Sequence, residues 1–253
     1  MKRLSAFAAM LLFVGTMMAE TRTLPAVGNK TELTISDDGN HVGLGLLSYK
    51  YNASQQYKPG RYTWSWLVWQ DESINYNDQV QFIDLAAKMG FEYCLVDNWW
   101  DERIGRNKIE ELSKYAQSKG VNLMLWYNSN GYENDAPQTP RDCMSTAIAR
   151  DKEMAWLQKI GVKGIKVDFF GGDKQCTMQL YEDILFDANR YGLQVIFHGC
   201  TMPRGWEMMY PNYVASEAVL ASERGTRPVS STAIRASMWC WLVATRLTGT
   251  LQV

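Results

Sequence analysis

The sequence has few of the features that mark several large functional classes. Its formal net charge is −1, and no run of basic residues alternates with aromatic ones, which argues against a nucleic-acid-binding protein. No glycine-rich phosphate fingerprint follows the first predicted strand, which argues against a nucleotide-binding fold. The five cysteines are scattered without metal-ligand spacing, and their odd number leaves at least one unpaired in an oxidising compartment. We therefore do not expect cysteine chemistry to be the function.

Long apolar runs are also scarce, apart from the one at the start of the chain. Residues 1–19 have a basic beginning, an apolar centre and a small residue at Ala19, which is typical of a secretory signal peptide. No later apolar stretch is long and uncharged enough to span a bilayer. We therefore expect an exported protein, periplasmic or secreted, that has no membrane association once the signal is removed.

Aromatic residues are plentiful, with ten tryptophans and thirteen tyrosines. Several fall at the ends of predicted strands, where flat apolar rings can stack on sugar faces. We assign more than half of these aromatic residues to the core, because large rings contribute most of their stabilisation when buried.

One unit recurs along the middle of the chain: an amphipathic helix, a glycine at its C-terminus, and then a strand. The predicted strands are Tyr62–Trp69, Phe91–Val96, Val121–Trp126, Val162–Phe169, Leu193–His198 and Tyr213–Leu220. The predicted helices are Asp78–Met89, Lys108–Lys119, Asp142–Ile160 and Lys174–Tyr191, with a short helical turn at Arg204–Met209. Strands that alternate with helices at this spacing predict parallel βα units.

The fold that we expect is a (β/α)8 barrel, incomplete at its C-terminal end, with an open doubly wound sheet as the alternative. Polar residues follow most predicted strands, and barrel enzymes build their active sites at the C-terminal ends of strands. These residues are Asp97, Asn98, Asn128, Asp168, His198 and Glu217. The expected boundaries are 1–19 for the signal, 20–58 for a lead-in that is not a domain, 59–223 for the barrel and 224–253 for an atypical tail.

The stretch Gly161–Gly172 is the strongest functional signal. Its apolar residues predict a buried strand, and Lys166 and Asp168 lie two residues apart on one face of it. A buried acid is costly unless it is paired or used. The pair is therefore either a structural ion pair or part of a site for a polar ligand.

Two carboxylates across a barrel mouth, with aromatic walls and no metal motif, indicate glycoside hydrolysis. Asp168 is the first carboxylate. Glu217 and Glu223 are candidates for the second, because each follows a serine after an apolar step. His198 stands at a strand end without a partner histidine, so a core role and a substrate or metal contact remain equally open.

The ordered set of motifs resembles the catalytic barrel of glycoside hydrolase family 97 over about Tyr57 to Glu223. The motifs are Trp64-Ser65-Trp66, Val96-Asp97-Asn98-Trp99-Trp100, Gly164–Phe169, Phe197-His198-Gly199, and Glu217 with Glu223. That family contains retaining α-galactosidases and inverting α-glucosidases, which are usually calcium-dependent.

The resemblance implies roles for individual residues. Asp168 matches the nucleophile of the retaining members, Glu223 their general acid/base, and Glu217 a calcium ligand. Lys166 and Asp97 resemble residues that bind sugar hydroxyls in a related clan of α-galactosidases. The further expected substrate contacts are Trp64, Trp99, Asn128 and His198.

The same resemblance favours the retaining branch. Inverting members lack the carboxylate at the Asp168 position and carry a glutamate base near the end of the fifth strand, where this sequence has Gly199. We therefore expect a retaining hydrolase of terminal α-galactosides. An inverting α-glucosidase is one alternative. The other is an inactive or sugar-binding remnant, because we expect the family's flanking β domains to be missing from this chain.

Overall fold

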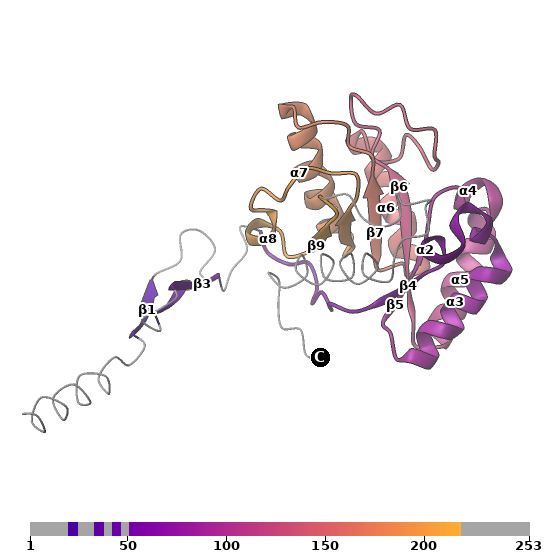
Figure 1. Cartoon of the computed structure of the whole chain (residues 1–253), viewed down its shortest axis with the longest axis horizontal. Coiled ribbons are helices and arrows are strands. Elements are labelled where there is room, and N and C mark those ends of the chain that lie inside the picture. The colour runs from indigo at the N-terminus through magenta and orange to yellow at the C-terminus, as the bar shows by residue number, and fades with distance from the viewer. Residues whose placement is uncertain (1–19, 25–32, 38–41, 47–50, 219–253) are drawn as a thin grey trace, which may run out of the picture. The chain divides into compact units, whose positions relative to one another are not determined.

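A computed structural model describes residues 20–24, 33–37, 42–46 and 51–218, and the chain divides into two compact units, residues 1–52 and 53–253 (Figure 1). The expected signal peptide, Glu223 and the expected tail all lie outside the described residues. In the first unit, β1 (Glu20–Leu24), β2 (Leu33–Asp37) and β3 (Val42–Leu46) form an antiparallel sheet. None of these three strands is among the predicted strands.

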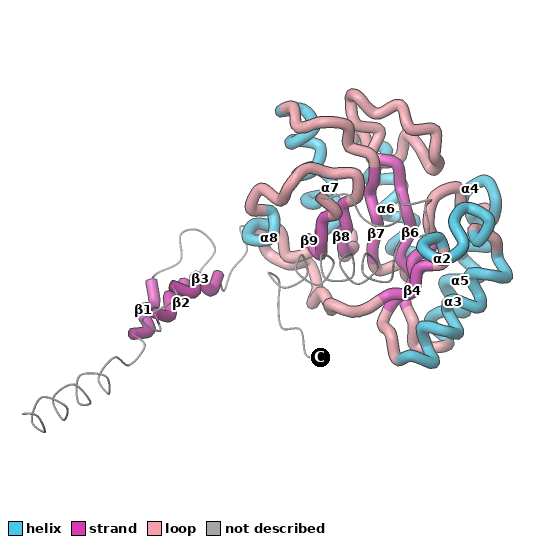
Figure 2. Tube along the Cα trace, viewed as in Figure 1, coloured by secondary structure: helices cyan, strands magenta, loops and turns pink. Residues whose placement is uncertain are grey.

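The second unit contains a parallel sheet of six strands in chain order, β4-β5-β6-β7-β8-β9 (Figure 2). The strands are β4 (Tyr62–Trp64), β5 (Tyr93–Val96), β6 (Asn122–Asn128), β7 (Gly164–Asp168), β8 (Gln194–Phe197) and β9 (Tyr213–Ser216). A doubly wound sheet reverses its strand order at a switch point, whereas these strands follow one another without reversal. The alternative of an open doubly wound sheet is therefore wrong.

The sheet is strongly curved, as a barrel requires. Trp64 on β4 and Ala215 on β9 belong to one buried cluster, which Tyr93, Leu95, Met124 and Ile196 complete. In a flat sheet, strands four places apart would lie about 19 Å from each other. The ring of Trp64 on β4 and the ring of His198, directly after β8, nevertheless have centroids 5.7 Å apart, so the sheet curls around the cluster. The expected incomplete (β/α) barrel is confirmed.

Four longer helices connect the strands as predicted: α3 (Tyr76–Met89), α5 (Arg106–Ser118), α6 (Ala147–Ile160) and α7 (Gln175–Arg190). Gly90 and Gly161 end α3 and α6 in the left-handed conformation, with φ of 68° and 83°. At the other end of the same helices, the side chains of Asn75 and Thr146 accept backbone N–H bonds. No helix among the described residues is long and apolar enough to cross a membrane.

The predicted strand Tyr62–Trp69 is wrong in its second half. β4 ends at Trp64, and residues Trp66–Trp69 form the short helix α2, followed by a 3-10 turn at Gln70–Ser73. The hydroxyl of Ser65 is buried and accepts hydrogen bonds from Ser73 and Gln79. These bonds fix the turn and override the preference of the aromatic and β-branched residues for a strand.

Two other boundaries differ from the prediction by more than two residues. Helix α6 begins at Ala147 and not at Asp142, which has a φ of 60° that a continuous helix does not allow. Strand β9 ends at Ser216. Two further helices are short. The helix α4 (Trp100–Arg103) follows β5, and α8 (Trp206–Met209) precedes β9 and lies within the predicted helical turn.

The curved core generates a stability prediction. Leu95 is fully buried in the barrel cluster, whereas Leu67 on α2 is 50% exposed. We expect Leu95→Ala to lower the free energy of unfolding by about 2–5 kcal/mol, because it leaves a cavity among atoms that relax only partly. Leu67→Ala, the matched control, should change it by less than about 0.5 kcal/mol. Urea unfolding followed by tryptophan fluorescence measures both. Equal effects would contradict the position of the core.

Candidate functional site

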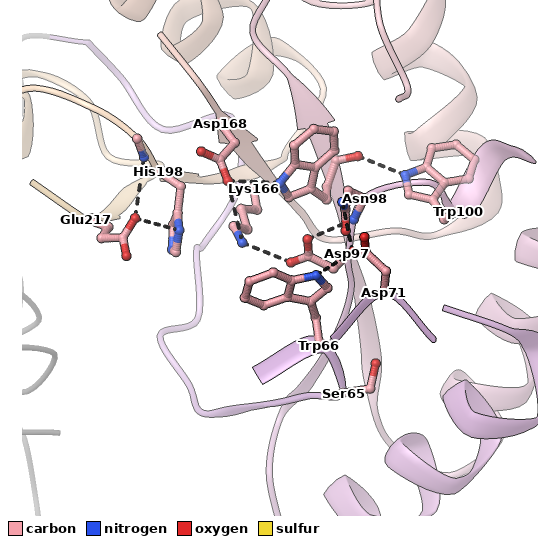
Figure 3. Close-up of polar contacts among 12 residues, drawn as sticks. Ser65, Trp66, Asp71, Asp97, Asn98, Trp100, Lys166, Asp168, His198 and Glu217 are labelled. Atoms are coloured by element: carbon pink, nitrogen blue, oxygen red, sulfur yellow. Dashed lines mark hydrogen bonds and ion pairs between the residues drawn. The ribbon is translucent and has the colours of Figure 1, made fainter. Parts of the chain in front are cut away.

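The predicted polar residues gather where the strands end, around Lys166 on β7 (Figure 3). The Lys166 ammonium lies 2.9 Å from Asp97 Oδ2 and 3.7 Å from Asp168 Oδ2. The three side chains are 3%, 4% and 11% exposed. Two carboxylates thus share one buried ammonium, which leaves the cluster with excess negative charge when all three are ionised. An aspartate in this setting is suited to attack an electron-poor carbon.

Trp64 forms one wall of this cluster. Lys166 Nζ lies 4.1 Å from the centroid of the Trp64 ring, a cation–π contact that gives the ammonium a third favourable neighbour. The His198 ring meets the edge of Trp64 with centroids 5.7 Å apart. Trp64 is buried in the barrel core, so its described contacts support the site residues. Its predicted contact with substrate stays a prediction.

The Asp168 carboxylate is held through both of its oxygens. Oδ1 accepts the backbone N–H of Phe169 at 2.8 Å, and Oδ2 accepts the indole N–H of Trp126 at 3.1 Å. Phe169 has a φ of 62°, which is unusual for a bulky residue and occurs most often at functional sites. The carboxylate is therefore fixed in orientation at the end of β7.

Gly199 leaves the Asp168 carboxylate the space that it occupies. A Cβ atom at position 199 would lie 2.8 Å from Asp168 Oδ1 and 3.0 Å from the nitrogen of Phe169. Gly199 also has a φ of 47°, in the left-handed region that favours glycine. A side chain at position 199 and the observed carboxylate of Asp168 cannot coexist without displacement.

His198 and Glu217 form a second pair beside the first. His198 Nδ1 lies 3.0 Å from Glu217 Oε2, and the same oxygen accepts the N–H of Gly199 at 3.5 Å. Calcium takes six to eight oxygen ligands. Within the described residues, no group of three acidic, histidine or cysteine side chains is arranged to hold a metal ion. Calcium also accepts backbone and amide oxygens, which are not part of such groups, so Glu217 as its ligand stays a prediction.

Asn128 and Trp99 both bond the loop that follows β6. Asn128 is fully buried, and its side chain donates to the carbonyls of Ala136 and Gln138. It also accepts from the backbone of Asn130 and the side chain of Asn134, so it organises the loop after β6. Trp99 is partly buried with a φ of 63°, and its N–H donates to Thr139 of that loop. Contact of either residue with substrate stays a prediction.

Two residues of this region are not among the predicted site residues. The Trp126 indole bonds Asp168, and the Asp71 carboxylate accepts from the Trp66 indole at 2.7 Å and from Asn98 at 3.3 Å. Trp126 precedes Asn128 by two residues, so strand alternation alone places it on the inner face. Asp71 had no such signal, because it lies in the unpredicted 3-10 turn that follows α2.

Cys200 lies next to the site but is not built as a nucleophile. Its sulfur lies 3.2 Å from the carbonyl oxygen of Glu217. Burial raises the pKa of the Cys200 thiol to about 12. The thiolate, which is the reactive form, is therefore scarce at neutral pH.

The comparisons with known proteins decide the family. The sequence model of glycoside hydrolase 97 matches residues 51–219. The chain belongs to glycoside hydrolase family 97. This match covers β4 to β9 and all of the site residues described above.

Two curated relatives in family 97 are α-galactosidases. A probable retaining α-galactosidase of Streptomyces bingchenggensis is 30% identical over 179 residues, covering 66% of this chain and 26% of the relative. A retaining α-galactosidase of Bacteroides thetaiotaomicron is 28% identical over 184 residues, covering 66% and 25%. The chain thus spans about a quarter of the length of these relatives.

Solved structures extend the comparison. A β-arabinopyranosidase is 64% identical with a TM-score of 0.68, and the match covers 70% of this chain and 28% of that one. A family 97 enzyme from Pseudoalteromonas sp. strain K8, in complex with panose, is 19% identical with a TM-score of 0.55, covering 70% and 32%. The latter supports the fold alone.

The buried thiols lead to a chemical prediction. Burial raises the pKa of Cys94, Cys143 and Cys200 to about 12 each, whereas Cys176 is exposed. At pH 8, a thiol with a pKa of about 12 is roughly one part in ten thousand thiolate. Iodoacetamide should therefore label Cys176 in the native chain and leave the other three unlabelled until guanidinium is added. Peptide mass spectrometry measures this, and labelling of Cys200 as fast as Cys176 would show that the site is open around it.

Proposed function

We propose that this chain carries the catalytic barrel of a retaining glycosidase, with Asp168 as the nucleophile and Glu223 as the general acid/base. The observation that supports this proposal most directly is the fixed Asp168 carboxylate, which accepts a hydrogen bond at each oxygen beside the ammonium of Lys166. In retaining glycosidases, two carboxyl groups lie about 5–5.5 Å apart, and one of them attacks the sugar.

In the first step, an Asp168 oxygen attacks the anomeric carbon and forms an ester while the glycosidic bond breaks. The proton of Glu223 passes to the departing oxygen. In the second step, Glu223 takes a proton from water, the water oxygen bonds the anomeric carbon, and Asp168 leaves as a carboxylate. Two inversions at one carbon give net retention.

Lys166 and Asp97 have a separate role in this proposal. Their 2.9 Å contact puts a donor and an acceptor together at the barrel mouth, next to the nucleophile. Sugar hydroxyls both donate and accept, so such a pair can hold adjacent hydroxyls of the terminal sugar. This is how we expect the ring to be oriented for attack by Asp168.

Gly199 supports retention over inversion. An inverting mechanism needs a carboxylate base on the far side of a water molecule. In the inverting members that the sequence resembles, this base lies near position 199, where a side chain would collide with Asp168 in this chain. The two arrangements therefore exclude one another at this point of the barrel, and this chain has the arrangement with Asp168.

For the substrate, we propose a terminal α-galactoside, in line with the two curated relatives. A terminal β-arabinopyranoside is the second candidate, favoured by the 64% identity to a β-arabinopyranosidase. A β-L-arabinopyranoside has the ring configuration of an α-D-galactoside but lacks the hydroxymethyl group. The same nucleophile and the same hydroxyl contacts can therefore act on either sugar.

We also propose that the protein is exported and that it binds calcium. Residues 1–19 support export, because they have the composition of a signal peptide. Calcium rests on the family resemblance, with Glu217 as the residue that we expect to contribute an oxygen. No step of the mechanism above is assigned to the ion.

The test is to assay the full chain on nitrophenyl glycosides of α-D-galactose, β-L-arabinopyranose and α-D-glucose, with and without calcium. We expect turnover of the first two and little of the glucoside. Proton NMR of the first-formed sugar should show the anomer of the substrate. Asp168→Asn keeps the shape of the side chain but lacks its charge, so it should reduce kcat by at least about 1,000-fold.

Two results would contradict this proposal. A first product of inverted configuration would remove Asp168 as the nucleophile. A folded chain that binds galactose or arabinose without turnover would favour the sugar-binding alternative.

A further inference from the structure

Trp126 is a buried donor to the proposed nucleophile, on the strand next to it. Its side chain is 1% exposed, and its indole nitrogen lies 3.1 Å from Asp168 Oδ2. Trp126 on β6 is paired with Lys166 on β7. Paired residues point to the same side of a sheet, so the Trp126 ring lies on the inner face together with the Lys166 side chain. The donor therefore comes from a rigid element, not from a loop.

The surroundings of Trp126 fix the direction of its N–H. Its backbone is part of β6, and its carbonyl oxygen accepts the indole N–H of Trp100 at 2.8 Å. Its ring is buried and lies at 70° to the ring of Phe169, with centroids 5.8 Å apart. A buried ring on a strand has little room to turn, so the carboxylate must adjust to the ring.

Other donors near Asp168 cannot do the same work. Lys166 Nζ is 3.7 Å from Oδ2 and is already bonded to Asp97 at 2.9 Å. The N–H of Phe169 reaches the other oxygen, Oδ1, at 2.8 Å. One bond alone leaves a carboxylate free to rotate about its Cβ–Cγ bond. With Trp126 on Oδ2 and Phe169 on Oδ1, both oxygens are fixed.

We propose that Trp126 is a positioning residue, whose indole N–H holds Asp168 in the orientation from which it attacks the anomeric carbon. This inference rests on the proposed function. The neutral indole fixes the carboxylate without neutralising its charge, so the carboxylate stays nucleophilic. In the second step, as the ester bond to the sugar breaks, the same N–H stabilises the negative charge that returns to Oδ2.

Trp126→Phe tests this role, because it keeps a ring on the strand and removes the donor. The matched control is Trp156→Phe, which removes another indole N–H whose partner is Glu110 on α5, not Asp168. We expect both variants to lose thermal stability. We expect Trp126→Phe alone to lower kcat by about 10- to 100-fold, with KM changed by less than about 3-fold.

The loss in Trp126→Phe should persist on dinitrophenyl glycosides, whose leaving group needs no proton from an acid. A defect in the acid would instead be rescued by such a substrate. Equal kcat in the Trp126 and Trp156 variants would overturn the proposal. So would full recovery on the dinitrophenyl substrate.

An NMR measurement tests the contact without any activity. The ten tryptophans give ten indole signals in a ¹⁵N–¹H spectrum of the full chain, and Trp126→Phe identifies one of them. Asp168→Ala should move the Trp126 signal upfield and leave the Trp66 signal in place. Asp71→Ala should do the reverse, because Asp71 bonds the Trp66 indole at 2.7 Å.

A Trp126 signal that does not move in Asp168→Ala would overturn the positioning role alone. Absence of turnover by the wild-type chain, with the Trp126 signal responding to Asp168, would overturn the proposed function and, with it, the role of Trp126 in the reaction. The two failures are therefore distinguishable.

Discussion

The rest of the site depends on the contacts of the buried Lys166 ammonium. It lies beneath the barrel mouth, 2.9 Å from Asp97, 3.7 Å from Asp168 and 4.1 Å from the centroid of the Trp64 ring. A buried charge is tolerable only where its partners repay the loss of water. Trp64 is on β4, Asp97 directly follows β5 and Asp168 is on β7, so the sheet must curl for them to meet. Fold and site are thus specified together, and loss of Lys166 would leave two buried carboxylates facing each other.

The two carboxylates next to Lys166 have different contacts. Asp97 takes the short contact with Lys166, and its Oδ1 accepts the N–H of Asn98 at 2.8 Å. Asp168 has the longer contact with Lys166 and neutral donors from Trp126 and Phe169. Asp97 thus forms the closer ion pair with Lys166, whereas the hydrogen bonds to Asp168 come from neutral donors. Gly199 gives that second carboxylate its room.

Much of this arrangement could be predicted from the sequence, because it depends on periodicity. The spacing of Lys166 and Asp168 put both on the inner face of a strand, and glycines such as Gly90 and Gly161 marked helix ends. Contacts set by side-chain direction could not be predicted. The bond from Trp126 to Asp168 depends on how an indole is turned, and the helix at Trp66–Trp69 depends on bonds made by Ser65. The sequence also does not show that the Asn128 side chain bonds the loop after β6.

If Asp168 is the nucleophile, it forms a covalent bond to the sugar, and this intermediate can be trapped. The full chain is incubated with 5-fluoro-α-D-galactosyl fluoride, whose ring fluorine slows both steps while its fluoride leaving group keeps the first one fast, and is then digested for mass spectrometry. We expect one fluorogalactosyl group on the peptide that contains Asp168, and none in Asp168→Asn. A group attached to Asp97 or Glu217 instead would contradict it.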